Sequence, residues 1–308
     1  MLESLPANPA LDSIKDPLLE QHGVSLDVLR LDAIHPRING NKWFKLKLNL
    51  QAARKSGHHT LLSFGGAYSN HLRALAAAAS QFGFRSIGVV RGEAPEPLNP
   101  VLAFAREQGM ILCPVSRAEY RLKEHAGFIE SLHERFGEFY LIPEGGSNAE
   151  GVAGCESIVD LLSPHLQASI PGTDSGRNLV ALACGTGATL AGLIRGVQRS
   201  GLAADLLGVA VLKGAGFLTD SVTAWLDNGI RYPDWQIAQE YHFGGYARQD
   251  ARLLAFITEF ADRTGIPLEP VYTGKLLFAL YDLVARGVIP AGSRVICLHT
   301  GGTYPGEA

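Results

Sequence analysis

The chain has 308 residues, a length typical of two domains, with 46% hydrophobic and 19% charged residues. This composition excludes an intrinsically disordered protein, and 27 basic against 30 acidic residues leave no electrostatic footprint for a nucleic-acid backbone or an anionic membrane surface. A small metabolite is therefore the expected partner. The 35 glycines predict many tight turns or close approaches of the backbone to a ligand.

The N-terminal residues are acidic where a secretory signal needs a basic and then an apolar stretch. No apolar run reaches the ~18 to 20 residues of a membrane span. The four cysteines are scattered singly, without the spacing of a metal site or a disulfide framework: Cys113, Cys155, Cys184 and Cys297. These features predict a cytoplasmic protein with no metal and no membrane partner.

From about residue 50 onward, short apolar runs alternate with helix-length segments, the pattern of βα units around a mainly parallel sheet. The clearest unit is a strand at residues 59–64, a glycine loop, and an alanine-rich helix that ends at Gly83, a natural C-terminal cap. The first half then continues as strand 86–92, helix 101–108, strand 110–115, one long helix 118–136 and strand 139–145.

The polar segment 167–178 predicts a loop. Beyond it we expect, in order, strand 179–184, a glycine loop, helix 190–201, strand 206–212, helices 250–264 and 271–287, and strand 293–299. The fold class is therefore α/β.

Three glycine loops, GGAYSN, CGTGAT and HTGGT, each follow a predicted strand, where open α/β sheets place their ligands. Backbone N–H groups are unshielded at their glycines, and a helix start beside them favours a phosphate or a carboxylate. These glycines are Gly65, Gly66, Gly185, Gly187, Gly301 and Gly302. None of the loops fits a dinucleotide or triphosphate motif. For any single loop, a simple tight turn is the alternative interpretation.

Lys42, in INGNKWFKL, lies among apolar and backbone groups that can desolvate its ammonium and lower its pKa, as a Schiff-base lysine requires. The alternative is a surface cation at a helix start. Lys45 and Lys47 are expected on a solvated helix face, and Lys275, in VYTGK, is expected to be a helix-start cation.

The motifs GNKWFKL, SFGGAYSNH, CGTGATLAG, PVYTGK and HTGGT occur in this order across roughly residues 30 to 305. Together they resemble the 1-aminocyclopropane-1-carboxylate deaminase and D-cysteine desulfhydrase family of pyridoxal-phosphate enzymes. The resemblance implies the tryptophan synthase β-like fold (fold type II): two open, twisted, mainly parallel sheets with flanking helices. It also implies a small domain, residues 46–143, inserted in a large cofactor-binding domain, residues 1–45 plus 144–308, with the cofactor in the cleft between them. Homodimers are common in this family.

By the same resemblance, Lys42 holds pyridoxal phosphate as a Schiff base and, once freed by the substrate, acts as the base for the Cα proton. Asn70 contacts the phenolic oxygen of the cofactor, and Ser69 lies beside the substrate. His71 stands where the deaminases often have glutamine, so we expect it near the substrate carboxylate.

The CGTGAT loop corresponds to the phosphate cradle of the family, in line with the anion site expected there. Its residues are Gly185, Thr186, Gly187, Ala188 and Thr189. Tyr272 matches a tyrosine that lies against the pyridine ring, and Tyr246 matches a second active-site tyrosine. Taken alone, either would more often be a core aromatic residue.

Two positions bear on the substrate. Deaminases that open the cyclopropane ring have glutamate after the ring-stacking tyrosine and leucine after the histidine of the last glycine loop, whereas this chain has Thr273 and Thr300. Both threonines resemble the D-cysteine desulfhydrase pattern, and both are expected at the cofactor. A carboxylate near the pyridine nitrogen deepens the electron sink, and a ring that lacks a Cα proton needs that deeper sink.

The sequence therefore predicts α,β-elimination on a small amino acid, with D-cysteine converted to pyruvate, sulfide and ammonia. D-Serine, β-chloroalanine or another amino acid are alternative substrates. A second alternative is deamination of 1-aminocyclopropane-1-carboxylate to 2-oxobutanoate and ammonia. A third is a protein that binds pyridoxal phosphate or an amino acid without turnover.

Overall fold

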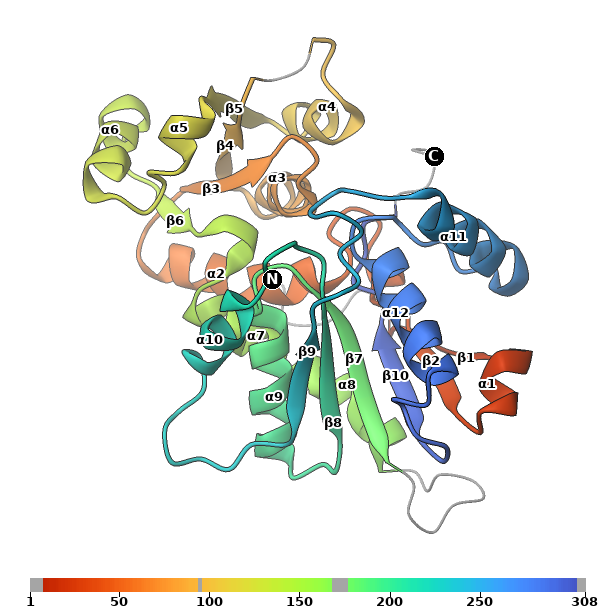
Figure 1. The fold of residues 1–308 in the computed structure, drawn as a ribbon. Helices are drawn as coiled ribbons and strands as arrows, with labels where there is room; N and C mark the ends of the chain where they lie inside the picture. The colour runs from red at the N-terminus through yellow and green to blue at the C-terminus, as the bar shows by residue number, and fades with distance from the viewer. Residues whose placement is uncertain (1–7, 94–95, 168–176, 304–308) are drawn as a thin grey trace.

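The computed structural model describes residues 8–93, 96–167 and 177–303, which form two separate sheets with helices packed on them (Figure 1). The large sheet has the order β1 (Leu11–Ile14), β2 (Ser25–Leu29), β10 (Arg294–Leu298), β7 (Asn178–Cys184), β8 (Asp205–Ala210), β9 (Trp235–Ala238). The small sheet has the order β5 (Met110–Val115), β4 (Arg85–Arg91), β3 (Thr60–Gly66), β6 (Tyr140–Ile142). All pairings are parallel except β1 with β2. The prediction of mainly parallel α/β sheets is confirmed.

Fourteen helical segments connect these strands in the described residues. They are α1 (Pro17–Gln21), η1 (Leu31–Ala33), α2 (Asn41–Lys55), α3 (Asn70–Phe82), α4 (Pro100–Glu107), α5 (Arg117–Tyr120), α6 (Ala126–Phe136), η2 (Glu144–Gly146), α7 (Ala149–Glu156), α8 (Ile158–Leu166), α9 (Ala188–Ser200), α10 (Phe217–Thr223), α11 (Ala251–Thr264) and α12 (Thr273–Ala285). None of the helices in the described part of the chain has the length and apolar character needed to cross a bilayer.

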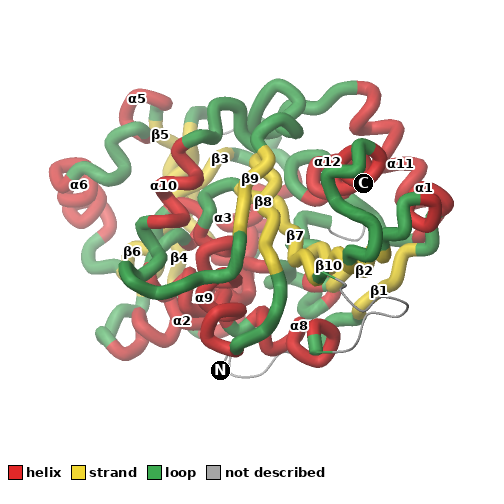
Figure 2. Tube along the Cα trace, turned by 60° about the horizontal axis from the view of Figure 1, so that its bottom comes forward, coloured by secondary structure: helices red, strands yellow, loops and turns green. Residues whose placement is uncertain are grey.

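Both faces of the large sheet are buried under helices, and successive side chains along each strand point to opposite faces. Val180 and Leu182 of β7 pack with α7, α8 and α9, whereas Ala181 and Ala183 pack with α1, α11 and α12. In the two views, α8 and α9 lie on one side of the six strands and α11 and α12 on the other (Figures 1 and 2). The small sheet is covered in the same way, by α3 and α4 on one face and by α5 and α6 on the other.

Helices α2 and α7 join the two sheets, because their apolar side chains belong to one core that reaches from α3 to α9. The approach between them is close. A Cβ on Gly154 of α7 would overlap the carbonyl oxygen of Phe44 on α2, and a Cβ on Gly192 of α9 would crowd the carbonyl oxygen of Val152. Several of the many glycines are thus helix contacts rather than turns.

Most of the elements that the local signals predicted are present at about the predicted positions. The strand predicted at 110–115 has those bounds, and α3 ends at Gly83, which has the left-handed conformation of a C-terminal cap. The long helix predicted at 118–136 was wrong: α5 and α6 are separated by a turn at 121–125, where Lys123 faces the ring of Tyr120 and the carboxylate of Glu144.

The sequence pattern missed β1, α1 and β2, which precede residue 50, and also α7, α8, α10 and β9. Most of the loop predicted at 167–178 lies outside the described residues. The four strands of the small sheet all fall within residues 60–142, but the predicted domain boundary between residues 45 and 46 falls inside α2. The division into domains 1–45 plus 144–308 and 46–143 therefore stays a prediction.

Candidate active site

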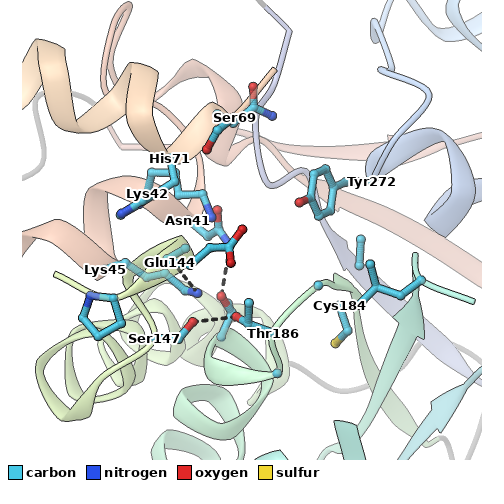
Figure 3. Close-up of a pocket in the computed structure, with 18 of the residues that line it drawn as sticks. Asn41, Lys42, Lys45, Ser69, His71, Glu144, Ser147, Cys184, Thr186 and Tyr272 are labelled. Atoms are coloured by element: carbon cyan, nitrogen blue, oxygen red, sulfur yellow. Dashed lines mark hydrogen bonds between the residues drawn. The ribbon is translucent and has the colours of Figure 1, made fainter. Parts of the chain in front are cut away.

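The loops that follow β3, β6, β7 and β10 meet the start of α2 around a cavity of about 530 Å³. Of the thirteen residues predicted from the sequence, eleven line it: Lys42, Ser69, Asn70, His71, Gly185, Thr186, Gly187, Thr189, Tyr246, Tyr272 and Thr300. Figure 3 shows Lys42, Lys45 and His71 on one side of this cavity and Tyr272 on the other. Because these residues come from segments around both sheets, the cavity forms only where the two sheets and their loops are packed together.

Lys42 is the second residue of α2 and is half-buried. The helix starts where it does because Gly40 has a positive φ of 66°, and a Cβ at that position would overlap the carbonyl oxygen of Thr300. Burial, followed by the charge of Lys45, lowers the pKa of Lys42 to about 7. A large fraction of its amine is therefore neutral, and nucleophilic, near neutral pH.

Lys45 lies one turn further along α2 and is buried, so the prediction of a solvated helix face was wrong for this residue. The reason is that this face of α2 packs between the two sheets, a burial that the hydrophobic periodicity of the helix sequence does not reveal. The Nζ of Lys45 donates to the carbonyl oxygen of Gly145 at 2.9 Å, and burial lowers its pKa. Lys47 is only partly exposed.

Ser69, Asn70 and His71 form the start of α3, where the Oγ of Ser69 accepts from the N–H of Leu72 at 3.3 Å. The Nε2 of His71 lies 2.9 Å from the Oγ of Ser63, and its Nδ1 is buried with no hydrogen-bond partner among the described residues. Burial and the charges of Lys42 and Lys45 hold the pKa of His71 well below its usual value. The imidazole is thus neutral, and one ring nitrogen is left for a ligand.

The start of α9 has the properties of a phosphate site. Its N-cap is Gly187, with φ of 78°. Because glycine has no side chain to accept a hydrogen bond, the N–H groups of the first turn are left for a ligand. Two hydroxyls flank it: Thr186 Oγ1 accepts from Ser147 Oγ at 2.7 Å, and Thr189 Oγ1 accepts from the Asn41 amide at 3.0 Å. This donor set suits a dianion.

Tyr272 immediately precedes α12, and its hydroxyl donates to that of Tyr246 at 3.3 Å, with the rings edge to face. Burial and the neighbouring Tyr246 raise the pKa of Tyr272 well above its usual value, so the phenol is protonated. Glu269 fixes the turn, because its carboxylate accepts from the N–H groups of Val271 and Tyr272, each at 2.7 Å.

Two predicted residues do not line the cavity. Thr273 is fully buried, and its hydroxyl lies 3.2 Å from the Glu269 carboxylate and accepts from the N–H of Glu269 at 3.0 Å. The expected contact of this hydroxyl with a cofactor is therefore not supported. The side chain of Ala188 is buried in the core, although its N–H belongs to the first turn of α9. Lys275 does lie at a helix start, as predicted, but it is fully buried.

Sequence reasoning missed several polar residues of the cavity: Asn41, Lys45, Arg91, Lys123, Glu124, Glu144 and Ser147. Glu144 and Ser147 follow β6 directly, and Arg91 ends β4. Their place at the carboxyl ends of parallel strands was the available signal, because ligands bind at that edge.

The family model for pyridoxal-phosphate dependent enzymes matches residues 15–301. The chain belongs to this family. Its cofactor is therefore pyridoxal phosphate, and the cavity fits it: an amine of lowered pKa, an uncapped helix start and a flat aromatic ring surround one space.

Two curated relatives support a narrower placement. The chain is 28% identical over 312 residues to a D-cysteine desulfhydrase of Klebsiella pneumoniae (strain 342), covering 93% of this chain and 89% of the relative. It is 27% identical over 295 residues to the mitochondrial bifunctional D-cysteine desulfhydrase/1-aminocyclopropane-1-carboxylate deaminase of Arabidopsis thaliana, covering 91% and 73%. The resemblance inferred from the five motifs is confirmed.

Among solved structures, a homologue of 1-aminocyclopropane-1-carboxylate deaminase superposes with a TM-score of 0.82 at 25% identity, covering 97% of this chain and 91% of that one. A fungal L-serine ammonia-lyase from Rhizomucor miehei superposes with a TM-score of 0.66 at 19% identity, which shows the shared fold alone. The predicted fold type II architecture is confirmed.

Proposed function

We propose that this pyridoxal-phosphate enzyme catalyses α,β-elimination on a small amino acid, with D-cysteine as substrate and pyruvate, sulfide and ammonia as products. Thr300 carries the proposal. It lines the cavity after β10, whereas the acidic residues of the described lining, Glu124 and Glu144, both belong to segments around the small sheet. By the family resemblance, ring-opening deaminases have leucine at the Thr300 position and glutamate at the Thr273 position, and a carboxylate near the pyridine nitrogen deepens the electron sink that ring opening needs.

The residues that would hold the cofactor come from the starts of four helices, α2, α3, α9 and α12. The Lys42 amine provides the covalent link, and the first turn of α9 with Thr186 and Thr189 binds the phosphate. By the family resemblance, the ring of Tyr272 would lie against the pyridine, and Asn70 would donate to the phenolic oxygen; both residues line the cavity. Lys45 lies on the same side of the cavity as Lys42 (Figure 3).

Pyridoxal phosphate, when bound, supplies the electron sink for the charge left at Cα. The Lys42 amine takes the Cα proton, a role for which a pKa of about 7 is well matched. We place the substrate carboxylate at the start of α3, because His71 lines the cavity there and its Nδ1 has no hydrogen-bond partner among the described residues. Ser69 lies beside the substrate at the same helix start.

The overall reaction balances with one water. As the Cα proton goes to Lys42, the electron pair forms a Cα–Cβ double bond, the Cβ–S bond breaks, and sulfide leaves with its electron pair. The released 2-aminoacrylate takes up one water and yields pyruvate and ammonia. Cysteine needs no strong acid at the leaving group, because thiolate is a good leaving group; serine does need one.

The test is a set of product assays on the holoenzyme with D-cysteine, L-cysteine, D-serine, β-chloroalanine and 1-aminocyclopropane-1-carboxylate. We expect pyruvate and sulfide in equal amounts from D-cysteine, with the highest kcat/KM of the set. Faster formation of 2-oxobutanoate from the cyclopropane substrate would overturn the proposal in favour of a deaminase. A coloured protein that releases no product from any of them would indicate a binding protein.

The proposal includes a homodimer, as is common in this family, and a cytoplasmic location. Light scattering would then give twice the chain mass of 33.0 kDa. A mass equal to that of one chain would contradict it.

A further inference from the structure

Lys275, the third residue of α12, is fully buried and is not used by the proposed mechanism. It lies three residues after Tyr272 but does not line the cavity. A buried ammonium is costly unless each of its three N–H groups finds an acceptor. The acceptors that Lys275 finds indicate what it does.

The three acceptors are backbone carbonyl oxygens. Lys275 Nζ donates to His242 and to Gly245, each at 2.9 Å, and to Val211 at 3.4 Å. None of the ion pairs found among the described residues involves Lys275. The ammonium thus occupies a cage of carbonyl dipoles that joins the end of β8 to the segment 242–245.

The segment 242–247 has no regular secondary structure, and its backbone is strained. Phe243 and Ala247 have φ of 53° and 54°, and they are the non-glycine residues with positive φ in the described chain. Gly244 and Gly245 between them have φ of 96° and 137°. Such conformations persist only where the surroundings hold them.

The bonds inside this segment are short-range. The N–H of Gly245 donates to the carbonyl of His242, and the N–H of Arg248 donates to that of Gly245. The same two carbonyls are the ones that accept from Lys275. Phe243 also packs edge to face on Phe278 of α12, whereas Lys275 donates to Gly245, the residue before Tyr246.

We propose that the ammonium of Lys275 is a fixed internal cation that holds the segment 242–247 in its strained conformation and so places the hydroxyl of Tyr246 against that of Tyr272. Lys275 is a positioning residue in this account. Lys275 on α12 and Glu269 just before that helix have matching roles. The carboxylate of Glu269 accepts from backbone N–H groups of the Tyr272 turn, and the ammonium of Lys275 donates to backbone carbonyls of the Tyr246 turn. The effect on turnover rests on the proposed function; the effect on the segment does not.

The first test is hydrogen exchange of the full chain saturated with pyridoxal phosphate, followed by mass spectrometry, for Lys275→Met and for Leu277→Met. Leu277 is a fully buried neighbour on α12, so its variant controls for a general loosening of the core. We expect amides of residues 242–248 to exchange about tenfold faster in Lys275→Met and at the wild-type rate in Leu277→Met. Should Lys275→Met not fold, Lys275→Gln, which also lacks the charge, takes its place with the same expectation. Wild-type exchange at 242–248 in either folded Lys275 variant would overturn the proposal.

The second test is a double-mutant cycle in the holoenzyme, with Lys275→Met and Tyr246→Phe alone and together. If Lys275 acts through the Tyr246 hydroxyl, the double variant should have the kcat of Tyr246→Phe, while the absorbance of bound pyridoxal phosphate is unchanged throughout. Additive losses of kcat would contradict a positioning role. If wild type has no turnover at all, the proposed function fails but the exchange result still decides the role of Lys275.

Discussion

Two strand–glycine loop–helix units face each other across the cavity and differ at the helix start. In the small sheet, α3 is capped by the side chain of Ser69, and its next residues are polar side chains, Asn70 and His71. In the large sheet, α9 starts at Gly187 with no side-chain cap. One helix start therefore presents side chains suited to a reacting molecule, and the other leaves bare N–H groups suited to a permanently held anion. Helix α2 lies between them and supplies Lys42.

The largest effect is expected when Lys42 is replaced, because Lys42 provides the covalent link to pyridoxal phosphate, on which the roles of both helix starts depend. Lys42→Ala should lose the absorption band expected at about 410–430 nm for cofactor bound through a lysine imine, and turnover should fall to background. A spectrum of the purified variant with added pyridoxal phosphate checks this. A band that survives the substitution would remove Lys42 from the covalent link.

Ser69→Ala tests the α3 side of the comparison. We expect the colour to remain and kcat/KM to fall by about 10²-fold, since a polar group beside the reacting atoms is lost. The variant should also lose about 1 kcal/mol of unfolding free energy, because the N-cap bond to Leu72 disappears. Unchanged kcat/KM would show that Ser69 is only a cap.

Thr186→Val tests the α9 side. Loss of one hydroxyl at the phosphate should weaken pyridoxal phosphate about tenfold, a free-energy change of about 1.4 kcal/mol, with kcat preserved at saturating cofactor. Titration of the apoprotein followed by fluorescence measures the Kd. If Ser69→Ala, rather than Thr186→Val, raised the Kd of pyridoxal phosphate, the different roles given to the two helix starts would be contradicted.

The smallest effect concerns pH. Because the pKa of Lys42 is lowered to about 7, the rate of cofactor attachment to the apoprotein should rise with pH and level off above about 7, rather than continuing to rise towards 10.5. Removing the nearby positive charge with Lys45→Met favours protonated Lys42, so this profile should move to higher pH. Lys47→Met is the matched control and should leave it in place. A shift to lower pH would contradict the electrostatic account.

What could be predicted from the sequence was local. Strand, glycine loop and helix follow one another within about twenty residues, so the two helix starts and their ligand-facing residues were accessible from motifs. Lys45 was missed because its burial depends on α2 packing between two sheets built from distant segments. The burial of the Thr273 hydroxyl was not foreseen for a related reason: its partner is a carboxylate, Glu269, whose role is visible only in the folded turn.

The helix predicted at 118–136 shows the same limit. Its periodicity is continuous, yet contacts of Lys123 with Tyr120 and Glu144 accompany a turn in its middle. Tertiary contacts there outweigh a helical preference of a few residues.

Three lysines with lowered pKa values, Lys42, Lys45 and Lys275, lie near the cavity, and only one of them can be the attachment site in this account. Reduction of the holoenzyme with borohydride, followed by peptide mass spectrometry, would fix the cofactor to its lysine. The account predicts a single pyridoxyl adduct on Lys42. An adduct on Lys45 or Lys275, or no adduct in a protein saturated with pyridoxal phosphate, would contradict it.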